Sequence, residues 1–226
     1  MANNEQQKGE MASHGLPEEV VDQTKLVDDS RRHFTKAGLA ASGVLLTLAS
    51  RSALGGTLVC KSPSGFQSGN VSQHGTPTEC IGRTPGYWQT NTDSLTEPHT
   101  WPSPYTTGKC LDPSKPLNYQ SWSNSGVDSG TMFRNVFSCT GHGIGLAPHS
   151  MMQVLLQNGS GDPYQLGAHI VAALLNAKMG WTPVLTEMQV VNIFNEYDSK
   201  GYFEPTAGVK WYQADIVNYL GSTQTL

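Results

Sequence analysis

Turn-forming residues are concentrated between positions 56 and 147, and they constrain the fold more than any other feature of the sequence. Clusters of Pro, Gly, Ser and Asn recur at 62–65, 84–86 and 123–126, and such clusters break helices and interrupt strands. Between them, only short runs such as 132–137 leave room for a strand or one helical turn. We therefore expect this half to fold irregularly and to need covalent cross-links for stability.

The second half of the chain has helical periodicity. Apolar residues between 166 and 179 recur at spacings of three and four, and Gly180 follows them, which is typical of a helix that ends at a glycine. We expect shorter helices over 148–157, from Thr186 onward, and over 209–220. The sequence therefore predicts a mainly α fold, in which a small C-terminal helical bundle packs on an irregular, disulfide-stapled, Gly/Pro-rich N-terminal half.

Residues 30–36 read Ser-Arg-Arg-His-Phe-Thr-Lys and resemble the twin-arginine export signal, whose pattern is S-R-R-x-F-L-K. The residues that identify the signal are Arg31, Arg32, Phe34 and Lys36. An apolar stretch follows at 37–49, too short to span a bilayer core of about 30 Å, and small residues at 52–56 suit cleavage by signal peptidase. The resemblance implies that the twin-arginine translocase exports the protein to the periplasm, the cell surface or the extracellular space, without a lasting transmembrane anchor.

The signal divides the chain into three expected parts. Residues 1–29 hold seven acidic residues against two lysines and few apolar residues, so we expect a disordered acidic leader. The twin-arginine signal occupies 30–55, unless this stretch is instead an amphipathic helix of the domain. Residues 56–226 form a single exported domain, irregular over 56–147 and helical over 148–226. The formal net charge of −4 indicates no basic face and argues against nucleic acid as a partner.

Four cysteines lie beyond the signal, at Cys60, Cys80, Cys110 and Cys139. They are separated by 20, 30 and 29 residues, whereas zinc and iron–sulfur sites use close pairs such as C-x-x-C. An even number of cysteines in an exported protein indicates two disulfides, with three possible connectivities. We favour Cys60–Cys80 and Cys110–Cys139, each adding about 3 kcal/mol to the free energy of unfolding by closing a loop.

A second resemblance rests on residues 80–91, which read Cys-Ile-Gly-Arg-Thr-Pro-Gly-Tyr-Trp-Gln-Thr-Asn, with Trp101-Pro102 following. This segment is similar to the T-P-G-Y-W-K-N-H segment of a group of secreted bacterial proteins. Those proteins also have a Cys before the segment and an alanine- and leucine-rich helix that ends in Leu-Asn, as 166–176 does here. At 89–91 this chain has Gln-Thr-Asn in place of Lys-Asn-His, so no role of that histidine transfers. The resemblance implies a secreted protein and brings no known reaction with it.

The order Thr84-Pro85-Gly86 predicts a tight turn, because Pro fixes φ and Gly permits a positive φ at the next position. In an extended chain after that turn, Tyr87 and Trp88 would point to opposite sides. Two interpretations stay open. Either both aromatic side chains are buried beside a disulfide, or one of them is exposed as a binding surface for a glycan or a partner protein.

The glycine-rich segment 139–150 holds His142 and His149, which are the most enzyme-like residues of the chain. Two histidines in a glycine loop can bind a metal or transfer protons if they meet in space. No G-x-S-x-G or H-E-x-x-H motif accompanies them, so surface or capping roles are favoured. We expect His169 to be a buried or boundary residue of its helix, and 198–204 lacks the alternating acids of an EF-hand loop. The sequence assigns no catalytic residue, metal or cofactor.

The composition is rich in Gly, Ser and Thr, and only 14% of the residues are charged, against about 25% in typical soluble domains. This favours an exported structural or adhesive protein that is not an enzyme. Such a protein would bind itself or a cell-surface partner, for example as a subunit of an assembly. The alternative is an exported enzyme, or a metal or cofactor binder, built around His142 and His149, since the twin-arginine route carries folded proteins that often hold a cofactor.

Overall fold

The computed structural model describes residues 59–68, 78–90, 99–157, 162 and 164–225. All of them belong to the unit Ser52–Leu226. The expected acidic leader and the twin-arginine segment lie outside the described residues, so their assignments stay predictions. The same holds for the export roles of Arg31, Arg32, Phe34 and Lys36.

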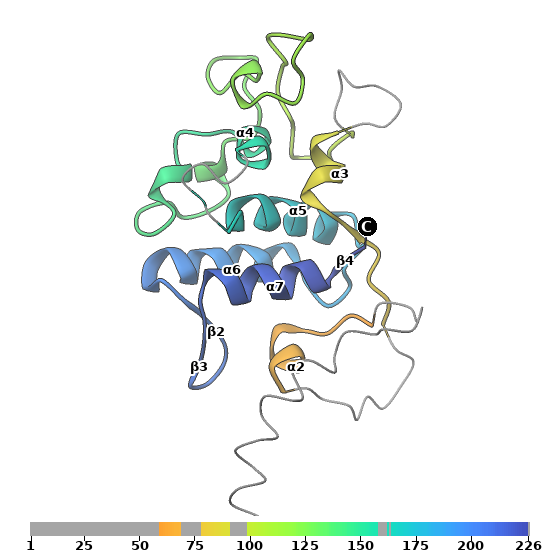
Figure 1. Cartoon of the computed structure of the whole chain (residues 1–226), viewed down its shortest axis with the longest axis vertical. Coiled ribbons are helices and arrows are strands. Elements are labelled where there is room, and N and C mark those ends of the chain that lie inside the picture. The colour runs from red at the N-terminus through yellow and green to blue at the C-terminus, as the bar shows by residue number, and fades with distance from the viewer. Residues whose placement is uncertain (1–58, 69–77, 91–98, 158–161, 163, 226) are drawn as a thin grey trace, which may run out of the picture. The chain divides into compact units, whose positions relative to one another are not determined.

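The fold is helix-rich, as the sequence predicts (Figure 1). Its helices are α2 (Pro63–Ser68), α3 (Pro85–Gln89), α4 (Met151–Leu156), α5 (Leu166–Lys178), α6 (Glu187–Lys200) and α7 (Gln213–Ser222). Single 3-10 turns lie at Tyr119–Ser121, Phe133–Asn135 and Ile144–Leu146. The described part of 56–147 therefore contains only short helical segments between loops, as its density of turn formers predicts. Of the helices in the described ranges, none is long and apolar enough to cross a membrane.

Helix α5 lies at the centre of the fold. It packs against α3, α4, α6 and α7, and Figure 1 shows it between α4 on one side and α6 and α7 on the other. Its residues from Ile170 to Leu175 are all fully buried, because a helix that is apolar on every side must be covered on every side. Gly180 follows the helix with a φ of 71°, in the left-handed region that favours glycine, so the predicted end is confirmed.

Helix α6 begins where the sequence predicts, at Thr186. The Thr186 hydroxyl accepts a hydrogen bond from the Gln189 N–H at 3.2 Å, and the Gln189 side chain accepts one from the Thr186 N–H at 2.8 Å. This reciprocal capping box satisfies two N–H groups that have no partner within the helix. Ser150 and Gln153 form the same arrangement at the start of α4. Both helix starts are therefore set by local side-chain chemistry.

The helix predicted over 209–220 begins later than expected. Val209–Trp211 is instead strand β3, which pairs antiparallel with β2 (Phe203–Thr206), and α7 starts only at Gln213. Gly208 turns the chain between the two strands with a φ of 80°. The expected start of this helix at 209 is therefore wrong, because 209–211 pair with β2 as a strand.

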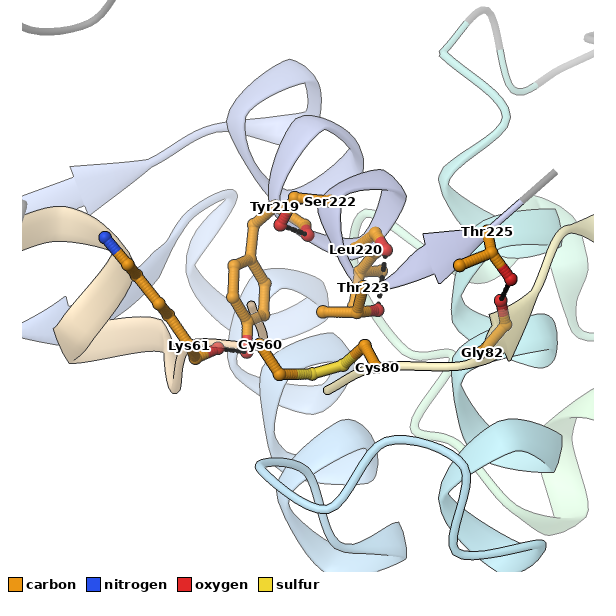
Figure 2. Close-up of a disulfide and its surroundings, with 9 residues drawn as sticks. All are labelled: Cys60, Lys61, Cys80, Gly82, Tyr219, Leu220, Ser222, Thr223 and Thr225. Atoms are coloured by element: carbon orange, nitrogen blue, oxygen red, sulfur yellow. Dashed lines mark hydrogen bonds between the residues drawn. A yellow bond between two sulfur atoms is a disulfide. The ribbon is translucent and has the colours of Figure 1, made fainter. Parts of the chain in front are cut away.

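A short parallel pair joins the middle of the chain to its C-terminal segment. Strand β1 (Gly82–Arg83) pairs with β4 (Gln224–Thr225), and the Thr225 hydroxyl donates to the Gly82 carbonyl at 3.1 Å (Figure 2). A Cβ on Gly82 would lie 2.5 Å from the Thr223 carbonyl oxygen and 2.8 Å from a methyl of Thr182. Only glycine therefore allows β1 to approach the C-terminal segment this closely.

The first expected disulfide is present. Figure 2 shows Cys60 and Cys80 joined, so that the segment leading to α2 is tied to the segment leading to β1. Beside this bridge, the Tyr219 hydroxyl of α7 donates to the Lys61 carbonyl at 3.1 Å. The disulfide therefore ties the first described segment to the segment before β1, and the Tyr219 hydrogen bond ties it to α7.

The second expected disulfide is wrong, since Cys110 and Cys139 are both free. Cys110 lies in a loop that forms a β-bridge with Trp122. Cys139 belongs to a different loop, whose next residue, Thr140, is bonded to Asp198 of α6. Burial, with a smaller contribution from the Asp198 charge, raises the pKa of the Cys139 thiol to about 11. Cys110 and Cys139 therefore lie in two loops that are bonded to different parts of the chain. The spacing of the cysteines in the sequence does not show that these loops are separate.

Candidate binding surface

Asn176, near the end of α5, is a fully buried junction between two distant segments. Its side-chain oxygen accepts hydrogen bonds from the Arg83 N–H at 2.9 Å and from the Trp88 indole N–H at 3.1 Å. Its side-chain nitrogen donates to the Arg83 carbonyl at 2.8 Å. A buried amide needs partners for both of its ends. Asn176 therefore fixes the backbone of Arg83 and the ring of Trp88, and it joins the two segments on which the second resemblance rests.

Trp88 is the buried centre of an aromatic cluster. Its exposed fraction is 1%, and its carbonyl accepts a hydrogen bond from the Trp101 indole at 3.2 Å. Trp181 stacks on it with ring centroids 5.4 Å apart, and Tyr87 meets it edge-on at 5.2 Å. Tyr87 and Trp181 are half-buried and lie 6.0 Å apart. Trp88 is therefore buried beneath Tyr87 and Trp181, and these two aromatic side chains are partly exposed.

Tyr87 contacts two further half-buried side chains. The ring of His99 stacks on it at 3.8 Å, nearly parallel, and the Arg83 guanidinium lies 5.3 Å from the centroid of its ring. Within the described ranges, no carboxylate forms an ion pair with Arg83. We call the four half-buried side chains together the Arg–aromatic surface, which consists of Arg83, Tyr87, His99 and Trp181.

The expected extended backbone at Tyr87 and Trp88 is wrong, whereas the expected difference in exposure between the two rings is present. The backbone after Thr84 is helical and not extended: Thr84 is the N-cap of α3, and its hydroxyl accepts from the Tyr87 N–H at 3.4 Å. One ring is nevertheless buried while the other is partly exposed. The contribution of Trp181 was not predicted, because Trp181 is more than 90 positions from Trp88. Its only local signal is its place directly after Gly180, where the chain leaves the helix.

The second candidate region, the glycine loop at 138–143, is fastened to the last turn of α6. Asp198 is fully buried there, and its backbone carbonyl accepts a hydrogen bond from the His142 N–H at 2.9 Å. Its carboxylate accepts further bonds, at 2.7 to 3.3 Å, from the backbone N–H groups of Thr140, Gly141 and Gly143 and from the hydroxyls of Ser138 and Thr140. This role of Asp198 was not predicted from the sequence, because all of these partners are more than 50 positions away.

The charge of Asp198 is stabilised by these bonds. Burial by itself raises the pKa of this carboxyl, but the N–H groups of Thr140 and Gly143, the Ser138 hydroxyl and the Gly141 N–H together lower it below its usual 3.8. A Cβ on Gly143 would lie 2.7 Å from the Phe194 ring. The glycines of this loop therefore allow the backbone to wrap closely around a carboxylate of the same chain.

The two histidines of the glycine-rich segment have different surroundings. His142 is exposed, and its ring lies 5.8 Å from that of Tyr197. His149 is half-buried, its Nδ1 is hydrogen-bonded to the Tyr119 hydroxyl, and burial lowers its pKa. The two rings pack on different tyrosines, Tyr197 and Tyr119. In the part of the chain that the structure describes, no three His, Cys, Asp or Glu side chains are grouped as metal ligands.

His169 is a boundary residue of α5, as predicted. It is half-buried, and its imidazole lies beside the Gln224 side chain of β4. Burial lowers the pKa of His169, although the neighbouring Gln224 and the charge of Asp162 act in the opposite direction.

The comparisons with known proteins add no assignment. Nothing among protein families, curated proteins or solved structures matches this chain. Its function must therefore be inferred from the geometry of the Arg–aromatic surface and the glycine loop.

Proposed function

We propose that this chain is an exported adhesive protein, not an enzyme, which binds a partner at the cell surface or in the extracellular space through the Arg–aromatic surface. The observation that carries the proposal is the Asn176 junction. Its three hydrogen bonds hold Arg83 and Trp88 in place and leave the side chains of Arg83, Tyr87 and Trp181 at the surface. Arg, Tyr and Trp are the residue types that contribute most to binding energy at interfaces.

Pre-organisation makes this surface better suited to binding than a loose set of aromatic side chains. Trp181 rests on the buried Trp88, and Tyr87 is in contact with both of them. Rings that are already fixed lose little conformational entropy when a partner binds. The glycine loop offers less, because the backbone N–H groups that bond Asp198 are no longer available to a ligand.

Two observations support the exported location. The segment at 30–36 resembles a twin-arginine signal. The Cys60–Cys80 disulfide is of the kind that persists in oxidising compartments outside the cytoplasm. We infer on these grounds that the mature protein acts in the periplasm, on the cell surface or in the medium.

The proposal is tested by binding of the purified, exported chain to whole cells and to envelope polysaccharides. Substitution of Tyr87→Ala or Trp181→Ala is expected to weaken binding about tenfold or more, the effect of removing an interface anchor. The matched control is Tyr164→Ala, since Tyr164 is an exposed aromatic residue outside the Arg–aromatic surface, with 54% of its area accessible. Thermal unfolding of each variant separates a loss of binding from a loss of fold. Equal binding by all three variants would contradict the proposal, as would a wild-type chain that binds no cell or polysaccharide.

A further inference from the structure

The Arg–aromatic surface contains three hydrogen-bond donors without an acceptor in the described part of the chain. They are the Arg83 guanidinium, the Tyr87 hydroxyl and the Trp181 indole N–H. Arg83 lies 5.3 Å from the Tyr87 ring, and that ring lies 6.0 Å from Trp181, so the donors belong to one continuous surface. Such a surface carries a positive charge, and no acid of the described residues is paired with it, so it is complementary to an anionic ligand that is rich in acceptors.

We propose that this surface binds an acidic glycan, with Arg83 bonded to the carboxylate of a uronic acid unit. This inference rests on the proposed function and names its ligand class. The planar guanidinium has parallel N–H groups that match the two oxygens of a carboxylate, and such charge-assisted pairs are about twice as strong as neutral hydrogen bonds. The Asn176 bonds to both the N–H and the carbonyl of Arg83 fix the base of the side chain that makes this contact.

The aromatic part of the surface favours a sugar over other carriers of a carboxylate. A pyranose ring has an apolar face of C–H groups and a rim of hydroxyls, and aromatic side chains provide a flat apolar body with a polar tip. Trp181, stacked on Trp88, provides such a body, and the unpaired Tyr87 hydroxyl provides a polar group next to Arg83. A neutral glycan would use the ring but leave the Arg83 charge without a partner.

The experiment is isothermal titration calorimetry of the exported chain with an oligogalacturonate and with the same oligosaccharide after complete methyl esterification. Esterification keeps the sugar rings and removes the negative charges. The wild-type chain is expected to bind the acidic form about tenfold or more tightly, the effect of one charge-assisted bidentate contact. Arg83→Gln is expected to abolish this preference, and the side-chain change leaves the Arg83 backbone bonds to Asn176 intact.

The matched control is Lys210→Gln. Lys210 lies 4.2 Å from the Tyr202 ring, so this variant removes one positive charge from a cation–aromatic pair that is not part of the Arg–aromatic surface. Its preference for the acidic glycan is expected to equal that of the wild type. Loss of the preference in both variants would show a general effect of net charge and would overturn the assignment to Arg83.

Three other results would overturn the inference. The wild-type chain could bind the acid and its ester equally, Arg83→Gln could keep the preference, or poly-L-glutamate could bind as tightly as the oligogalacturonate. In the last case the ligand is an acidic peptide and not a glycan. Cell binding that depends on Tyr87 and Trp181 but shows no preference for acid would overturn this inference alone. Cell binding that ignores Tyr87 and Trp181 would overturn the proposed function itself.

Discussion

Two segments of this protein are each bonded to a helix through one fully buried polar side chain. One of these two side chains is a charged carboxylate and the other is a neutral amide. Asp198 of α6 holds the glycine loop at 138–143. Asn176 of α5 holds the segment from Arg83 to Trp88. A carboxylate only accepts hydrogen bonds, whereas an amide both donates and accepts. Asp198 therefore gathers N–H and hydroxyl groups around itself, while Asn176 satisfies both polar groups of the Arg83 backbone.

The two loops also differ in what they leave available to a ligand. Around Asp198, the donors of the glycine loop point at a carboxylate of the same chain, and the loop is satisfied internally. Around Asn176, the bonds use the backbone of Arg83 and the indole of a buried Trp88, so the side chains of Arg83 and Tyr87 stay at the surface. The backbone donors of the glycine loop are therefore already used within the chain, whereas the side chains of Arg83 and Tyr87 remain available for the binding that we propose.

The largest effect on stability is expected from Asp198→Ala. The substitution leaves the N–H groups of Thr140, Gly141 and Gly143 without their buried acceptor. Hydrogen bonds to a charged group are lost, and the buried Gly143 N–H is left without an acceptor. The free energy of unfolding should therefore fall by about 3–5 kcal/mol in urea titrations. Asp128→Ala is the control, because within the described residues the Asp128 side chain makes only an exposed ion pair with Lys109. Loss of this pair should change the free energy of unfolding by about 0.5 kcal/mol or less.

A smaller loss of stability, with a larger loss of binding, is expected from Asn176→Ala. Three hydrogen bonds disappear, which should lower the free energy of unfolding by about 2–3 kcal/mol. Because Trp88 and Arg83 are no longer fixed, binding to cells should weaken more in this variant than in Asp198→Ala. The exposed Asn124 provides the control substitution. If Asp198→Ala weakened binding as much as Asn176→Ala, the two loops would not be functionally distinct.

The smallest effect on stability is expected from lowering the pH. Because hydrogen bonds lower the pKa of Asp198 in the folded state, its contribution to stability is complete above its usual 3.8 and is lost as the pH falls through the lowered pKa. Hydrogen exchange of the Gly141 and Gly143 amides, corrected for the intrinsic rate, should therefore accelerate only below about pH 3.8. The Arg83 amide, bonded to a neutral side chain, should show no such change. Equal acceleration at both sites would indicate global unfolding and contradict a local role for the Asp198 charge.

Much of the helical structure could be predicted from the sequence, because the signals are local. The apolar spacing of α5, its terminal Gly180 and the Thr186 cap of α6 all lie within one or two helical turns of the features they set. The predictions failed where the contacts between strands or between loops decide the structure. Residues 209–211 became a strand because they meet β2, and Cys110 and Cys139 stayed apart because each belongs to a separately held loop.

Only part of the candidate site could be predicted from the sequence. Tyr87 and Trp88 stand out in their segment, but Trp181 and the role of Asn176 depend on the packing of that segment against α5. His142 and His149 stand out equally, yet they have different neighbours. Sequence spacing carries no information on whether two loop residues face the same way.

The sequence by itself determined the helix-rich second half and the irregular first half, since periodicity and turn chemistry act over neighbouring residues. Only the tertiary structure decided which polar residue each loop is bound to. A buried carboxylate or amide must find partners wherever the fold brings them, and for Asp198 and Asn176 those partners lie 55–60 and 88–93 positions away. That requirement, imposed by burial, fixes the glycine loop around Asp198 and the segment from Arg83 to Trp88 around Asn176.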